Sequence, residues 1–172
     1  MRQGKQTILG ETTIQSLAGM VKGGAGVLSA LALGAANTKL FVDAAGTAPE
    51  FALGNKIGTF SINQETATGT QAITNVGFKP SLLIFFAVQG NVVGKMSVGF
   101  DSGSARYCIW DRNNATEDTW GGSSTRSITV YEGTSTLYAG LIDSMDADGF
   151  TIGWTRTGTP TGIAEIYYAA FR

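Results

Sequence analysis

The sequence of 172 residues contains no histidine and a single cysteine, Cys108. The missing histidine removes the commonest general base and the commonest metal ligand. Cys108 has no second cysteine for an intrachain disulfide and no histidine to activate its thiol, so we predict that it is a small buried residue. Because no nucleophile motif is present either, we predict that the chain is not an enzyme and binds no metal and no cofactor.

Charge is also scarce. Charged residues make up 15% of the chain, against roughly 25% in ordinary soluble domains. The net charge is −1 and the basic residues are scattered, so there is no basic footprint for nucleic acid. The apolar stretch 26–34 is far shorter than the roughly 20 residues that span a bilayer. We therefore expect neither nucleic acid nor a membrane as a partner, and we expect surface to be hidden against other subunits.

Glycine is plentiful, with 24 residues, and many of them divide residues 1–58 into short apolar clusters. Each cluster is too small to bury itself, which suits short strands or turns packed against identical neighbours about a threefold axis or against a host structure. A flexible linker is the alternative. Two short helices are predicted, over Glu11–Val21 and over Val27–Leu33, from apolar residues at helical spacing.

From Thr59 onward the apolar residues follow a period of two, with turn signals every eight to twelve residues. The run Ser81–Val88 is continuously apolar, as expected of a strand buried on both faces. Phe150, Ile152 and Trp154 are predicted to share one face. About eight short strands of this kind predict an antiparallel β-sandwich, jelly-roll-like, over residues 59–172. The chain is thus predicted to be mostly β, with an extended Gly/Ala-rich segment, 1–58, ahead of the sandwich.

A polar loop is predicted from Asp111 to Ser124, and it contains the residues most suited to binding. Carboxylates beside tryptophans are typical of sugar sites, because sugars need both stacking and hydrogen bonds to hydroxyls. The candidate contact residues for a glycan or receptor are Trp110, Asp111, Arg112, Asp118 and Trp120. Catalysis is disfavoured because paired carboxylates need a rigid frame. The alternative is plain loop structure.

Three aspartates, Asp143, Asp146 and Asp148, precede Gly149 and raise the question of a calcium site. No glutamate stands at the twelfth position of a loop, and the run leads directly into a predicted strand. A solvated turn is the favoured interpretation.

Two blocks of the sequence resemble the β-sandwich domains at the ends of tailed-phage fibres and related virion proteins. The first runs from Gln71 through Gly77-Phe78-Lys79-Pro80 into Leu82–Val88, and the second is Asp146-Ala147-Asp148-Gly149-Phe150-Thr151-Ile152-Gly153-Trp154-Thr155, followed by Tyr167–Phe171. Upstream, the strand predicted at Thr38–Val42 and the unit Ala48-Pro49-Glu50-Phe51 resemble a linker of phage tail-fibre proteins.

The resemblance implies a homotrimeric virion protein whose residues 1–58 attach it to capsid or tail proteins, in a particle assembled in the host cytoplasm. Its outward β-sandwich would form a fibre, spike or capsid decoration that contacts a host surface. The alternative function is a lectin-like module that binds carbohydrate or another receptor.

Overall fold

The computed structural model describes the backbone of residues 20–24, 27–31, 38–42, 49–89, 94–113 and 118–172, and the side chains from residue 54 onward within those ranges. The chain divides into two compact units, 1–52 and 53–172. The boundary lies ahead of the one predicted near Gly58, because the first strand of the second unit, β5 (Asn55–Asn63), runs through Gly58 without a break.

The first unit contains short paired strands. Strands β1 (Met20–Gly24) and β2 (Val27–Leu31) form an antiparallel pair in which Gly24 lies opposite Val27. Strands β3 (Thr38–Val42) and β4 (Pro49–Leu53) form a second two-stranded sheet, which confirms the strand predicted at Thr38–Val42.

Neither predicted helix of this unit is confirmed. The helix predicted over Val27–Leu33 is wrong, because residues 27–31 form β2. Most of the helix predicted over Glu11–Val21 lies outside the described residues, and Met20 and Val21 begin β1. A helix of so few residues is marginally stable by itself. Hydrogen bonding between β1 and β2 outweighs the helical spacing of the apolar residues, and β-branched residues favour strands.

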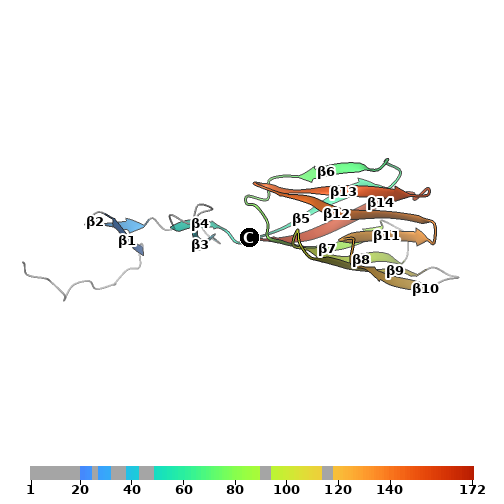
Figure 1. The fold of residues 1–172 in the computed structure, drawn as a ribbon, viewed down its shortest axis with the longest axis horizontal. Coiled ribbons are helices and arrows are strands. Elements are labelled where there is room, and N and C mark those ends of the chain that lie inside the picture. Colours follow the sequence, from blue (N-terminus) through green and yellow to red (C-terminus); the bar gives the residue numbers. More distant parts are fainter. Residues whose placement is uncertain (1–19, 25–26, 32–37, 43–48, 90–93, 114–117) are drawn as a thin grey trace, which may run out of the picture. The chain divides into compact units, whose positions relative to one another are not determined.

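The second unit is an antiparallel β-sandwich, as predicted (Figure 1). Its six-stranded sheet has the order β10-β9-β8-β7-β14-β5, and its four-stranded sheet has the order β11-β12-β13-β6. The further strands are β6 (Gly69–Ile73), β7 (Leu82–Gln89), β8 (Lys95–Asp101), β9 (Arg106–Asn113), β10 (Asp118–Ser123), β11 (Ile128–Gly133), β12 (Thr136–Asp146), β13 (Gly149–Thr157) and β14 (Ile163–Phe171).

The core lies between the two sheets and is rich in aromatic rings. Phe150 of β13 meets Phe85 of β7 and Tyr168 of β14 edge to face, with ring centroids 5.8 and 5.2 Å apart. Tyr138 stacks on Trp154 within the four-stranded sheet. Phe150, Ile152 and Trp154 are all buried, so the prediction that they share one inward face is confirmed.

Asp148 joins the two sequence blocks that carry the resemblance. It stands in the turn between β12 and β13, and its carboxylate accepts hydrogen bonds from the backbone N–H of Gly77 (2.6 Å) and of Asn75 (3.2 Å). The neighbouring Gly149 has φ +151°, and a Cβ there would lie 1.9 Å from the carbonyl oxygen of Ile73. The turn therefore requires glycine at this position for both backbone conformation and space.

Strand β7 differs from its prediction in one respect. Leu83, Phe85 and Ala87 point into the core and are buried, but Phe86 and Val88 point to the other side of the sheet and are 51% and 40% exposed. A strand with this uninterrupted apolar sequence was predicted to be covered on both faces. In the part of the chain that the structure describes, only the inner face of β7 is fully covered.

Candidate functional site

The region predicted as a polar loop is instead a β-hairpin. Strands β9 and β10 pair antiparallel, with Trp120 opposite Asp111 and Gly121 opposite Trp110. Successive side chains of a strand point to opposite faces, so the hairpin divides the five candidate residues between the two sides of the sheet. Trp110 and Arg112 point to one side, and Asp111, Asp118 and Trp120 point to the other.

Trp110 belongs to the inner side. Its ring stacks on Tyr131 of β11 with centroids 4.1 Å apart, and it lies over Gly121, where an added Cβ would come within 2.2 Å of it. Arg112 is in register with Lys95 and Thr119 on the same side. The Trp110–Tyr131 stack thus connects the six-stranded sheet to the four-stranded sheet and is part of the interior packing.

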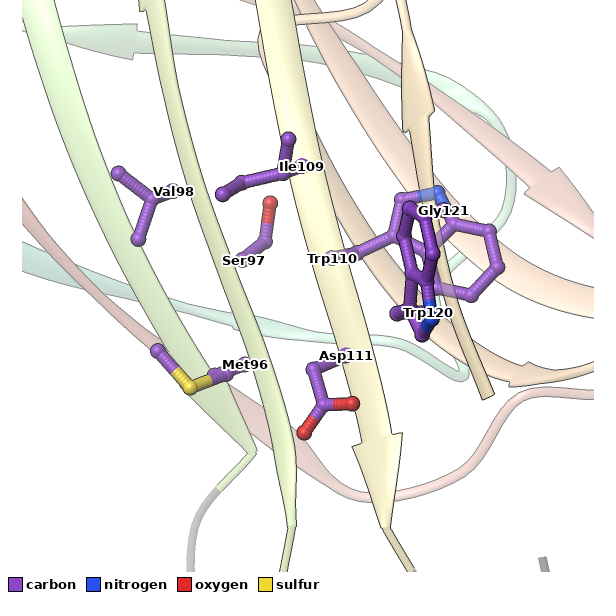
Figure 2. A pocket seen from close by; sticks show the side chains of 8 residues that line it. All are labelled: Met96, Ser97, Val98, Ile109, Trp110, Asp111, Trp120 and Gly121. Carbon is purple, nitrogen blue, oxygen red and sulfur yellow. The ribbon is translucent and has the colours of Figure 1, made fainter. Parts of the chain in front are cut away.

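Trp120, Asp111 and Asp118 belong to the outer side of the six-stranded sheet. Trp120 is 81% exposed. It stands beside a hollow of about 310 Å³ that is also lined by Met96, Val98, Ile109 and Asp111 (Figure 2). Almost all of the lining is apolar, and among the residues that the structure describes Asp111 is the only ionisable one that contributes to it. The hollow therefore offers stacking and apolar contact with very few hydrogen-bonding groups.

The hollow is part of a larger surface, which we call the outer face: the side of the six-stranded sheet that points away from the four-stranded sheet. Strand register places every exposed large hydrophobic side chain among the described residues on this face. They are Ile57, Phe86, Val88, Met96, Phe100, Tyr107, Ile109, Trp120, Ile163, Tyr167 and Phe171. A second hollow, lined by residues such as Ile84, Phe100 and Tyr107, shares Val98 and Ile109 with the first.

The charged side chains that the described strands place on the outer face are all acidic. Along the described strands its ionisable carboxylates are Asp111, Asp118 and Glu165, and no Lys or Arg points to this side. Asp111 and Glu165 share one cross-strand row with Trp120 at one end of the sheet, so the centre and the opposite end are free of charge.

The two ends of the sandwich differ. At one end the backbone N–H of Arg172 donates to the carbonyl oxygen of Gly54 (3.1 Å), so the chain enters the sandwich beside its last residue. Trp120 lies in the row of Glu165, which is six residues back along β14 from Phe171, or about 20 Å at strand spacing. Trp120, Asp111 and Asp118 therefore lie at the end remote from Gly54.

A buried carboxylate that the sequence analysis did not single out, Asp101, lies inside the sandwich. Asp101 is fully buried and accepts hydrogen bonds from Arg106 Nε (2.9 Å) and from the backbone N–H of Gly103 (2.7 Å) and Ile142 (3.3 Å). The Ser127 hydroxyl donates to the same carboxylate. Because Ile142 belongs to the four-stranded sheet, this ion-paired group joins the two sheets and serves packing.

The three aspartates before Gly149 do not converge. Asp146 accepts hydrogen bonds from the hydroxyls of Ser144 (2.7 Å) and Thr151 (2.8 Å), and these bonds lower the pKa of its carboxyl. Asp148 holds the backbone of Asn75 and Gly77. Within the described ranges no group of three or more metal-ligating side chains is found. The geometry agrees with a hydrogen-bonded turn at this position.

Cys108 is buried on the inner side of β9, 3.4 Å from the Thr129 hydroxyl, and burial raises the pKa of its thiol. The prediction that it is a small buried residue is confirmed. A raised thiol pKa disfavours the thiolate, which is the nucleophilic form.

No protein-family model, curated protein or solved structure matches the chain. In the part of the chain that the structure describes, no helix is long and apolar enough to cross a membrane.

Proposed function

We propose that this protein is a structural component of a tailed-phage virion: a homotrimeric fibre, spike or capsid decoration. The segment ahead of the sandwich attaches it to other virion proteins, and the sandwich presents its remote end outward, where it contacts the host surface. In this role the chain carries adhesive surfaces and no catalytic machinery. Several weak contacts from the copies of one assembly add up through avidity.

The observation that carries the proposal is the polarity of the sandwich. Gly54 and Arg172 lie together at one end, and the most exposed aromatic side chain of the described residues, Trp120, stands at the other. A domain joined to the rest of the chain at one end, with its other end free to face outward, suits a projecting subunit. The resemblance to phage fibre domains adds to this, because its two sequence blocks meet in space through Asp148.

The test is to purify particles by density gradient from a lysate of the phage or prophage that encodes the chain. We expect the chain to band with the particles and an antibody against residues 53–172 to label projecting structures in electron micrographs. Intact particles that lack the chain would overturn the proposal. Dissection of the particle into heads and tails before labelling then shows which part carries it.

A lectin-like function is the second candidate, and the pair of Trp120 and Asp111 favours it. An exposed indole beside a carboxylate can stack on a sugar ring and accept hydrogen bonds from its hydroxyls. We expect a glycan recognised there to lose binding with Trp120→Ala and to retain it with Thr155→Ala, a change on the other sheet. Because the adjoining hollow is almost wholly apolar, this candidate ranks second.

A further inference from the structure

We propose that the outer face of the six-stranded sheet is an interface between copies of this chain, so that sandwiches associate directly with one another. This adds a contact inside the second unit to the attachment proposed for the segment ahead of the sandwich. It holds whether or not the chain belongs to a virion.

The size of the outer face is the first argument. Its eleven large hydrophobic side chains are between 36% and 81% exposed. At roughly 200 Å² for a large side chain, this amounts to about 1,000 Å² of apolar surface. The largest patch on a monomer is typically about 300–600 Å², and a stable interface buries about 800 Å² on each partner. The outer face is large enough to form such an interface by itself.

The sequence of β7 is the second argument. An apolar run such as Leu82–Val88 is typical of strands covered on both faces, yet Phe86 and Val88 are exposed in the single chain. Covering the outer face with another sheet would place both residues in the environment that their sequence indicates. Sheets pack face to face in this way within sandwiches.

The composition of the face indicates that the partner is another copy of this chain. Interfaces between identical subunits are more apolar than transient ones, with aromatic residues and methionine enriched and charge depleted at their centre. The outer face follows this pattern: Phe86, Phe100 and Tyr167 stand in the region without charge, and the acids are confined to the remote end, where Met96 lies opposite Asp111. A nucleic acid or another acidic partner would meet only like charge here.

The test uses the full chain in solution. The double variant Phe86→Lys/Ile109→Lys places two charges at the centre of the outer face, at side chains that are already half exposed and so leave the core untouched. The matched control is Thr70→Lys/Thr155→Lys, which adds the same charge to the exposed side of the four-stranded sheet. Sedimentation velocity over a dilution series gives the mass of each species. Near-UV circular dichroism verifies that each variant is folded, and the single variant Ile57→Lys serves if the double variant is not.

A second measurement reports on the face itself. Acrylamide quenching of tryptophan fluorescence measures how accessible Trp120 is. Trp154 is buried and Trp110 stacks on Tyr131, and the Trp120→Phe variant gives the signal of these two tryptophans alone, which is subtracted. We expect the wild type to be oligomeric, with Trp120 shielded at high concentration and exposed on dilution. The outer-face variant should dissociate at least tenfold more readily and expose Trp120, whereas the control should match the wild type.

Two outcomes would overturn the proposal. One is a wild type that stays monomeric at tens of micromolar, with Trp120 freely quenched. The other is an oligomer in which Trp120 is quenched equally in the wild type and the outer-face variant, because the copies would then be held together elsewhere and the outer face would be open to a different partner.

Discussion

Replacing Asp101 with asparagine tests whether the buried carboxylate holds the two sheets together. Asp101 Oδ2 accepts from Arg106 Nε and from the Ile142 N–H, while Oδ1 accepts from the Gly103 N–H. Asparagine keeps the shape of the side chain but offers one acceptor oxygen, so at least one donor faces the new amide NH2 group. The charge that pairs with Arg106 is also lost.

The magnitude follows from burial. Asp101 is fully buried, whereas the Arg106 side chain is 26% exposed and keeps some contact with water. Breaking a fully buried ion pair costs about 3–5 kcal/mol, and the partial exposure of Arg106 places the expected loss near the lower end, at about 3 kcal/mol. The free energy of unfolding of a single domain is about 5–15 kcal/mol in all, so this loss is a large share of the stability.

The assay is urea unfolding of the full chain at one fixed protein concentration, followed by near-UV circular dichroism and tryptophan emission. The midpoint should fall by roughly 1–2 M with an unchanged slope. Glu65→Gln makes the same chemical change at an exposed position. Its free energy of unfolding should stay within about 0.5 kcal/mol of the wild-type value. If Asp101→Asn did so too, the carboxylate would contribute little to joining the sheets and the reasoning would be refuted.

Two further predictions concern backbone and burial. Gly149→Ala should destabilise the sandwich by about 2–4 kcal/mol, because its Cβ would overlap the carbonyl oxygen of Ile73. The control in the same urea series is Gly69→Ala, whose Cβ meets nothing closer than 3.8 Å. Equal unfolding midpoints for the two variants would contradict the argument. Cys108 should react with an aromatic disulfide reagent only after unfolding. Burial raises the pKa of the Cys108 thiol from the ordinary 9.0, so the thiol loses its proton at a lower pH in the unfolded chain than in the folded chain. The contribution of this thiol to stability should therefore be retained below pH 9 and fall as the pH rises above 9. The fall should be smaller in Cys108→Val, and fast labelling of the folded protein would refute the assignment.

The β-sandwich was predictable from the sequence because the alternation of apolar and polar residues is a local property of a strand. The inward face of β13, with Phe150, Ile152 and Trp154, and the strand at Thr38–Val42 were both confirmed. The same local reasoning failed at Val27–Leu33, where a helical pattern of apolar residues was overridden by pairing between β1 and β2.

The candidate site was less predictable. Trp120 lies in the segment predicted as a polar loop and Trp110 lies directly before it, and nothing in their spacing showed that the two strands pair as a hairpin. Once it is, register decides the outcome: Trp120 lies opposite Asp111 on the outer face, and Trp110 lies opposite Gly121 on the inner side. A shift of one residue in this pairing would exchange the two.

The sequence by itself determined that the chain is built of short antiparallel strands, that Cys108 is a small buried residue, and where the tight turn at Asp148-Gly149 falls. These follow from residue type and spacing along one strand or turn. Only the tertiary structure decided that Asp101 is a buried link between the sheets and that the apolar side chains left in water gather on one face. Both depend on which strands become neighbours, and that is set by contacts between segments far apart in the chain.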